Sequence, residues 1–417
     1  MITQDIQNKA NYCLSCINKP CLNGCPLKND IAGFIKLIKE GKLEEAYQLL
    51  SETTILESIC GRICPHSKQC QGSCIRGIKG KPVSIGELET YIGDLAIKNN
   101  WDYFTPKKEM NKKVAIIGSG PAGLSCAAFL RKQGIQVTIY EKHNYLGGLL
   151  RHGIPDFRLP KTILDKTIDK ILSLGIRVEL NQELGKNLSL SKLEKEYDAI
   201  FIGIGANISS TMNIVGEQLE GVYGGNELLE NENYPELLNK TVIVQGGGNV
   251  AMDVARTLNK LGAKVKIIYR RSEKEMPAEQ KEIKEAKEEG IEFILQNNIL
   301  KINGKDHVES IECIKTELVA VENERPRPQN IEGSNYTIEC DYVVMAIGGK
   351  PEEDIVKSLG IELDSKKKII INELGQTSNN KIFAGGDITN TPSTVAYAAR
   401  SGKDAAVNIT KYLKGEL

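Results

Sequence analysis

Two stretches of matching pattern decide the fold: KKVAIIGSGPAGLSCAAFLRKQGIQVTIYEK at residues 112–142 and KTVIVQGGGNVAMDVARTLNKLGAKVKIIYRR at residues 240–271. Each has the pattern of an apolar strand, a glycine-rich turn, a helix and a second strand. In that context GxGxx(G/A) is typical of a dinucleotide-binding unit, whose helix amino terminus faces a pyrophosphate. We therefore predict an α/β chain with two nucleotide-binding domains. The alternative is a pair of plain βαβ units with glycine turns.

The second strands of the two units end differently, which predicts two different nucleotides. Glu141 closes the first unit, where a carboxylate accepts a hydrogen bond from a ribose hydroxyl. Arg270 and Arg271 close the second, where guanidinium groups bind a 2′-phosphate that a carboxylate would repel. We expect FAD in the first unit and NADPH, rather than NADH, in the second. The alternative is that one of the two arginines only faces solvent.

Two further segments are expected to contact the flavin. The glycines of GGLL at residues 147–150 indicate backbone packed against a cofactor, and FAGGDI at residues 383–388 precedes a helix beginning near Thr394. The amino terminus of that helix would stabilise reduced flavin, with a turn-forming Asp387 as the alternative. The predicted FAD-binding residues are Gly118, Gly120, Pro121, Ala122, Gly123, Glu141, Lys142, Gly148, Leu149, Gly386, Asp387, Thr394 and Val395. The predicted NADPH-binding residues are Gly246, Gly248, Asn249, Val250, Ala251, Arg270 and Arg271.

Three other segments lead to structural expectations. DAIFIGIGA at residues 198–206 and DYVVMAIGG at residues 341–349 are apolar strands ending in glycine turns. Both are expected to return the chain to the FAD sheet, before and after an inserted domain. The charged stretch EKEMPAEQKEIKEAKEEG at residues 273–290 predicts the solvated face of a helix, with Pro277 near its start.

Cysteines concentrate near the amino terminus, in CLSCINKPCLNGCP at residues 13–26 and CGRICPHSKQCQGSC at residues 60–74. Disulfides are rare in a reducing compartment, and zinc sites seldom combine this density with proline after cysteine. The first run is similar to the ferredoxin run that ends in Cys-Pro, whose last cysteine ligates the other cluster. Iron–sulfur clusters are therefore favoured over disulfides and zinc.

Composition excludes several classes of function. Lys+Arg and Asp+Glu are both 54, so no global charge argues for nucleic acid or a membrane surface as partner. The polar amino terminus and the lack of a long apolar run argue against a signal peptide and a membrane span, so we expect a cytoplasmic protein. The histidines form no triad, and no CxxC lies beside the first glycine turn. We therefore predict no catalytic acid, base or nucleophile.

The order of cysteine runs, first glycine turn, second glycine turn and FAGGD resembles one family from Cys13 to nearly the last residue. It includes the glutamate synthase small subunit, the amino-terminal half of dihydropyrimidine dehydrogenase and the large subunit of the bifurcating ferredoxin:NADP oxidoreductase. The resemblance implies FAD, a nicotinamide nucleotide and two [4Fe–4S] clusters. The implied domains are a helical iron–sulfur domain at 1–108, an FAD domain at 109–237 and 345–417, and an inserted NADP domain at 238–344.

The resemblance also implies which residues ligate the clusters. In the family pattern the first cluster takes the positions of Cys13, Cys16, Cys21 and Cys74. The second takes those of Cys25, Cys64, Cys70 and Glu89, the last residue of IGELE at 85–89. Counting cysteines alone makes Cys60 the eighth ligand instead, so both residues stay candidates.

The motifs predict an NAD(P)H-dependent FAD and iron–sulfur oxidoreductase. The chain has no second flavin domain, so electrons are expected to pass to a separate partner subunit. GIPDFRLPK at 153–161 and the final helix look like the NAD(P)H subunit of a bacterial dihydropyrimidine dehydrogenase, which is our main expectation. YRRSEKEMPA at 269–278 looks like the glutamate synthase small chain, the first alternative; the ferredoxin:NADP enzyme is the second. A nucleotide-binding scaffold without turnover is the non-enzymatic alternative.

Overall fold

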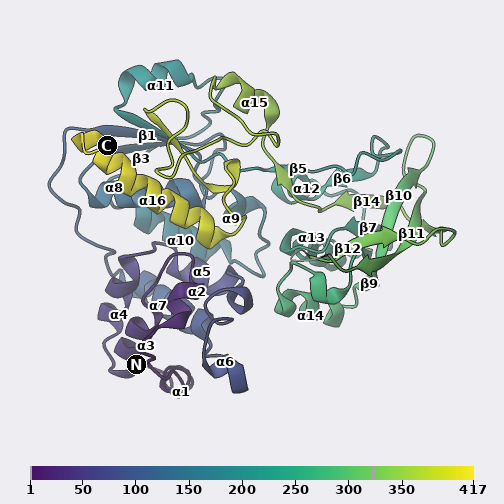
Figure 1. The fold of residues 1–417 in the computed structure, drawn as a ribbon, viewed down its shortest axis with the longest axis horizontal. Coiled ribbons are helices and arrows are strands. Elements are labelled where there is room, and N and C mark those ends of the chain that lie inside the picture. The colour runs from purple at the N-terminus through teal and green to yellow at the C-terminus, as the bar shows by residue number, and fades with distance from the viewer. Residues whose placement is uncertain (1, 322–324) are drawn as a thin grey trace. The chain divides into compact units, whose positions relative to one another are not determined.

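A computed structural model describes residues 2–321 and 325–417, and Figure 1 gives the course of the chain. The chain divides into two compact units. The first comprises Met1–Arg151, Asp156–Ala206 and Pro351–Leu417, and the second comprises His152–Pro155 and Asn207–Lys350. Within the described ranges, no helix has the length and apolar character that crossing a bilayer requires.

The first hundred residues form short helices, drawn in purple in Figure 1. They are α1 (Gln4–Asn11), α2 (Pro20–Gly24), α3 (Ile31–Lys39), α4 (Leu43–Ser51), α5 (Glu57–Ile63), η1 (His66–Lys68), α6 (Arg76–Lys79) and α7 (Ile85–Asn99). Helix α5 packs closely on α7. If Gly61 or Gly93 carried a Cβ atom, that atom would lie only 2.5 Å from a backbone nitrogen of the other helix. Glycine at both positions therefore permits the close approach of α5, which carries Cys60 and is followed by Cys64, to α7, which carries Glu89.

The remainder of the first unit surrounds a parallel sheet of order β16-β4-β1-β2-β3. Its strands are β1 (Lys113–Ile117), β2 (Gln136–Tyr140), β3 (Arg177–Glu179), β4 (Ala199–Ile202) and β16 (Ile382–Ala384). The helices are α8 (Pro121–Lys132), α9 (Leu149–His152), α10 (Lys161–Leu172), α11 (Leu190–Glu196), α15 (Glu353–Ser358), η3 (Gly386–Ile388) and α16 (Val395–Lys414). α16 crosses α8 so closely that a Cβ at Gly402 would lie 2.0 Å from the Ala122 carbonyl oxygen. The last helix of the chain thus packs on the helix that follows the first glycine turn.

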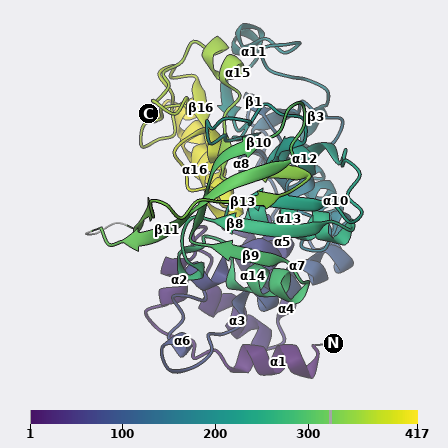
Figure 2. The same cartoon turned by 90° about the vertical axis from the view of Figure 1, so that its right-hand side faces the viewer.

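The second unit contains a parallel sheet of order β6-β14-β7-β8-β9, of which β8 and β9 are labelled in Figure 2. Its strands are β6 (Val222–Gly224), β7 (Thr241–Gln245), β8 (Lys264–Tyr269), β9 (Glu292–Leu295) and β14 (Tyr342–Met345). The remaining strands are β5 (Ile208–Ser209), β10 (Asn297–Asn303), β11 (Ser310–Val319), β12 (Arg327–Asn330), β13 (Tyr336–Glu339) and β15 (Gly349–Lys350). The helices are α12 (Gly225–Asn231), α13 (Asn249–Lys260), η2 (Glu273–Glu275) and α14 (Gln280–Glu288).

The strand in DYVVMAIGG corrects one expectation. DAIFIGIGA supplies β4 of the first sheet as predicted, but β14 pairs with β6 and β7 in the second sheet. The reason is a repeated contact at the start of each strand. Asp198 accepts the Lys113 amide at 2.8 Å in the first sheet, and Asp341 accepts the Thr241 amide at 2.8 Å in the second. DAIFIGIGA therefore belongs to the sheet that contains the first GxGxx(G/A) turn, and DYVVMAIGG belongs to the sheet that contains the second.

The charged stretch at residues 273–290 is only partly the solvated face that its composition predicts. The helix begins at Gln280, three residues after Pro277, and its lysines are exposed. However, the Arg256 guanidinium on α13 is buried, and it contacts Glu282 at 2.5 Å and both Glu285 and Glu289 at 2.9 Å. Three of the acidic residues thus join α14 to α13, which buries a charge that needs partners.

Candidate functional site

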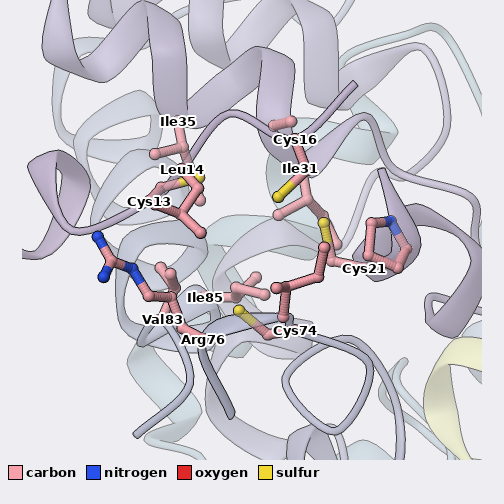
Figure 3. A pocket seen from close by; sticks show the side chains of 13 residues that line it. Cys13, Leu14, Cys16, Cys21, Ile31, Ile35, Cys74, Arg76, Val83 and Ile85 are labelled. Carbon is pink, nitrogen blue, oxygen red and sulfur yellow. The ribbon is translucent and has the colours of Figure 1, made fainter. Parts of the chain in front are cut away.

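Four cysteines converge at the amino-terminal helices. Figure 3 shows the sulfur atoms of Cys13, Cys16, Cys21 and Cys74 pointing into one pocket, which is lined otherwise by apolar side chains and Arg76. Residues far apart in sequence meet there because Arg76 on α6 donates to the Tyr12 carbonyl at 2.9 Å and stacks on the Tyr12 ring at 4.3 Å. The Ser15 amide lies 3.4 Å from the Cys13 sulfur. Four sulfurs with an amide donor fit an iron–sulfur cluster.

A second group of cysteines lies deeper in the same helices. Cys25, Cys64 and Cys70 are buried, and so are the two candidates for the eighth ligand, Cys60 and Glu89. The charge of Glu89 raises the pKa values of Cys25, Cys64 and Cys70, so its carboxylate lies within electrostatic reach of all three thiols. Its Oε1 accepts a hydrogen bond from Asn29 Nδ2 at 3.1 Å. Glu89 thus influences all three cysteines, whereas Cys60 contacts Cys64 and influences Cys25.

Burial of these thiols fits a site that holds iron. Burial raises the pKa of Cys21 and of Cys25 to about 11 each. Contact with Cys60, followed by burial, raises the pKa of Cys64 well above its ordinary value. A thiol ligates metal as thiolate, so the cation must supply the stabilisation that water cannot give in a buried site. Burial also raises the pKa of Glu89 to about 8, and Glu57 contributes through its charge.

The first glycine turn connects β1 to α8 and has the open form that a pyrophosphate requires. Gly118 adopts φ +97°, and a Cβ at Gly123 would lie 2.0 Å from the Gly118 carbonyl oxygen. In contrast, a Cβ at Gly120 would meet nothing within 4 Å. The turn therefore needs glycine at positions 118 and 123 to adopt its own conformation. Beside Gly120 it leaves space that a ligand could occupy. Pro121, at the first position of α8, suits a helix amino terminus.

Glu141 follows β2 and is held in place by three donors. Its Oε2 accepts hydrogen bonds from the Ser119 amide at 2.9 Å and hydroxyl at 2.5 Å, and its Oε1 accepts the His143 amide at 3.0 Å. The Ser119 hydroxyl in turn accepts the Gly147 amide at 3.0 Å. The predicted acid and the GGLL segment are thus joined through Ser119, which the sequence pattern did not single out because it occupies a variable position of GxGxx(G/A).

The remaining predicted flavin residues lie near this turn or on its neighbours. A Cβ at Gly148 would lie 3.0 Å from the Gly120 Cα, and one at Gly386 would lie 3.1 Å from the Ala122 Cβ. Leu149 begins α9, Val395 begins α16, and Lys142 is exposed. Thr394 caps α16 by accepting the Tyr397 amide at 3.3 Å. The observed helix start agrees with the prediction.

Asp387 in η3 has a buried carboxylate oxygen that a bound flavin could pair with. Its side chain is largely buried, and burial raises its pKa. Among the described residues, its Oδ1 is shielded from solvent without a hydrogen-bond partner. A buried acceptor in this state is costly unless a ligand supplies a donor. This residue therefore fits a bound group with hydroxyl or N–H donors, such as the ribityl chain of a flavin.

The second glycine turn connects β7 to α13. A Cβ at Gly246 would lie 2.2 Å from the Ala346 carbonyl oxygen, whereas one at Gly248 would meet only Pro277, at 3.8 Å. Ala251 is buried, Val250 is half-buried, and Asn249 accepts the Glu279 amide at 2.9 Å. The turn therefore combines one tightly packed glycine with one open position, as the first turn does.

Contacts of two arginines, Arg271 and Arg325, join the end of β8 to residues 325–326, and Arg270 and Arg327 lie next to these segments in sequence. Arg270 is exposed, whereas Arg271 is half-buried and donates through Nε to the Pro326 carbonyl at 2.9 Å. Arg325 donates to the Tyr269 hydroxyl at 2.9 Å, and Arg327 begins β12. The sequence reasoning missed Arg325 and Arg327, because they lie about 55 residues further along and no spacing rule connects them to β8. Clustered guanidinium groups form a site suited to a phosphate.

Comparison with known proteins identifies the family. Residues 112–402 match pyridine nucleotide-disulphide oxidoreductases, and residues 1–101 match dihydropyrimidine dehydrogenase domain II, 4Fe-4S cluster. The chain is 37% identical to the glutamate synthase [NADPH] small chain of Escherichia coli (strain K12), covering 97% of this chain and 91% of that one. It is 38% identical to the putative oxidoreductase AegA of the same organism, covering 98% of this chain and 65% of AegA.

A solved structure supports the fold alone. Mycobacterium tuberculosis FprA in complex with NADPH superposes with a TM-score of 0.66 at 21% identity, over 73% of this chain and 85% of that one. The chain belongs to the pyridine nucleotide-disulphide oxidoreductase family and, with its amino-terminal iron–sulfur domain, to the family of the glutamate synthase small chain. The predicted fold class, the oxidoreductase activity and the FAD, iron–sulfur and nicotinamide cofactors are confirmed by this membership.

Proposed function

We propose that this member of the glutamate synthase small chain family is the NADPH-oxidising subunit of a glutamate synthase-type complex. It would take electrons from NADPH and deliver them to a larger partner that carries the substrate-reducing site. The observation that carries the proposal is the convergence of the Cys13, Cys16, Cys21 and Cys74 sulfurs in a chain that also has two dinucleotide turns. When bound, FAD would accept a hydride and the clusters would carry single electrons.

The residues of the chain would position these groups. The first glycine turn would seat the FAD pyrophosphate, Glu141 would accept the ribose hydroxyl, and Asp387 would accept a donor from the flavin side. In the second unit, Arg271 and Arg325 would bind the 2′-phosphate with charge-assisted hydrogen bonds, with Arg270 at the rim. Hydride transfer between bound cofactors needs orientation rather than proton transfer by a side chain, so we assign no catalytic acid or base.

We propose Cys13, Cys16, Cys21 and Cys74 as the ligands of one cluster, and Cys25, Cys64, Cys70 and Glu89 as those of the other. Glu89 is supported by its influence on all three cysteines and by its burial. Cys60 is the competing candidate, and its contact with Cys64 shows that it also lies nearby. A carboxylate is a harder ligand than a thiolate, so it would shift the potential of the cluster.

The choice of complex rests on the relatives. The glutamate synthase small chain matches over nearly its whole length, and YRRSEKEMPA carries the same resemblance. Our main expectation from the sequence is a dihydropyrimidine dehydrogenase-like enzyme. It is supported only by the family match of residues 1–101, which describes the iron–sulfur domain and not the rest of the chain. The alternative expectation is therefore the better supported of the two.

Purification from the native source with a tag on this chain tests the proposal. We expect a larger subunit to co-purify and the complex to form glutamate from glutamine and 2-oxoglutarate with NADPH. NADPH-dependent reduction of uracil by the complex would instead select the pyrimidine enzyme. The isolated chain should oxidise NADPH with ferricyanide as acceptor. Failure of that reaction in flavin- and cluster-loaded protein would overturn the assignment as an electron-input subunit.

A further inference from the structure

Apolar side chains are exposed around the site of Cys13, Cys16, Cys21 and Cys74. Ile17, which directly follows Cys16, is 96% exposed, and Leu14 is 51% exposed. On the other side of the site, Ile75 is 43% and Ile78 is 76% exposed. Leu14 and Ile75 line the same pocket as the four sulfurs. Isolated exposed apolar residues are ordinary, but a group beside one site marks an interaction surface.

The same region lacks negative charge. Residues 6–29 and 58–86, which supply all eight clustered cysteines, contain no aspartate or glutamate, although the whole chain has equal numbers of acidic and basic residues. Three of the flanking acids are held in ion pairs: Asp5 and Glu87 share Lys9 at 2.5 Å each, and Asp30 contacts Lys19 at 2.6 Å. Lysine and arginine are therefore the only charged residues that the two segments themselves contribute.

Exposed lysines and a fixed loop give the surface its shape. Lys79 and Lys81 are exposed, and neither forms an ion pair with any of the described residues. The Tyr12 hydroxyl donates to the Lys81 carbonyl at 3.1 Å, and Arg76 stacks on the Tyr12 ring. These contacts hold the lysine-bearing segment against the Cys13 loop. We define the cluster-side surface as Leu14, Ile17, Ile75, Ile78, Lys79 and Lys81.

We propose that the cluster-side surface binds the acidic face of an electron-transfer protein or domain, in which carboxylates surround a redox centre close to solvent. This inference rests on the proposed function, and it adds the chemistry of the partner and the place where it binds. Opposite charge would steer the partner, and the isoleucines would supply apolar contact at the centre. Complexes for electron transfer are typically small and transient, so a surface of this limited extent is sufficient. A second copy of the chain is disfavoured, because it would present the same positive charge.

Binding measurements with charge-reversed protein test the proposal. The FAD- and cluster-loaded chain is immobilised, and the probe is an acidic plant-type [2Fe–2S] ferredoxin, at low and at high ionic strength. Lys79→Glu with Lys81→Glu should weaken binding by about tenfold or more at low ionic strength and much less at high. Ile17→Ser with Ile78→Ser should weaken it at both. The matched controls, Lys366→Glu with Lys367→Glu and Val407→Ser, change exposed residues elsewhere and should bind as wild type does.

Several outcomes would overturn the proposal. They are affinity for ferredoxin unchanged in both double variants, an equal loss in the controls, or no binding of ferredoxin by the wild type at low ionic strength. Heparin binding that depends equally on Lys79 and Lys81 would indicate a general polyanion site instead. A wild-type dimer that the variants dissociate would indicate self-association. Ferricyanide reduction by NADPH is measured in parallel: if it persists while ferredoxin binding fails, the docking inference is wrong and the proposed function stands.

Discussion

The hydroxyl of Ser119 lies 2.5 Å from the carboxylate of Glu141 and also accepts the amide of Gly147. One side chain thus fixes the ribose-binding acid of the predicted flavin site and the loop that packs near the glycine turn. A hydrogen bond to a charged group contributes about 1.5–3 kcal/mol to stability. The position of Glu141 therefore depends on Ser119, which occupies a variable position of the GxGxx(G/A) fingerprint.

Replacement of Ser119 by alanine should weaken FAD binding by roughly tenfold, because Glu141 loses one of its donors and the Gly147 amide loses its acceptor. The measurement is the Kd for FAD in flavin-stripped protein by fluorescence. Ser125→Ala is the matched control, since Ser125 lies on α8, the helix that follows the turn of Ser119, and its buried hydroxyl has no hydrogen-bond partner among the described residues. Equal Kd values in the two variants would show that Ser119 does not support the site.

Arg325→Ala should lower kcat/KM for NADPH by roughly tenfold and leave the value for NADH nearly unchanged. The reason is that only NADPH carries a 2′-phosphate, which would lose its charge-assisted hydrogen bond from Arg325. Arg271→Ala should act in the same direction. Steady-state rates with ferricyanide measure both. Lys301→Ala removes an exposed cation of the same unit and should change neither nucleotide. An equal fall for NADPH and NADH would argue for a structural role instead.

Glu89→Ala should reduce the bound iron and sulfide from two clusters to one, whereas Cys60→Ser should retain both. The reason is that the buried carboxylate of Glu89 acts electrostatically on Cys25, Cys64 and Cys70. Iron and sulfide analysis with electron paramagnetic resonance of the reduced protein distinguishes the clusters. Glu87→Ala, two residues earlier on the same helix and exposed, serves as control. The reverse pattern, with loss only in Cys60→Ser, would assign the eighth ligand to Cys60.

Glu57→Gln should stabilise the protein increasingly as the pH rises from 6 to 8. Burial raises the pKa of Glu57 to about 8 from an ordinary value of 4.5. Between those values the unfolded chain releases a proton that the folded chain retains, so wild-type stability falls with rising pH. The glutamine variant lacks this loss, and its advantage should exceed about 1 kcal/mol near pH 8. Thermal unfolding across this range measures it, with exposed Glu45→Gln as control; a constant difference would contradict the shifted pKa.

Local patterns in the sequence predicted both parallel sheets, because each glycine turn lies between strands that are adjacent in the chain. The strand in DYVVMAIGG was assigned to the wrong sheet, since only the contact of Asp341 with Thr241 and Lys240 shows which turn it accompanies. Arg325 and Ser119 were missed for a related reason: neither fits a motif, and both act through contacts that folding creates. The predicted ligands and domain boundaries remain predictions.

Strand β16 and helix α16 make the first sheet depend on residues far along the chain. β16 pairs with β4 across some 180 residues, and α16 packs on α8 with Gly402 against Ala122. A chain cut before Ile382 would therefore lack both the edge strand of this sheet and the helix that packs on α8. Because Asp387 and Thr394 lie between those two elements, the same cut would remove two of the predicted flavin contacts.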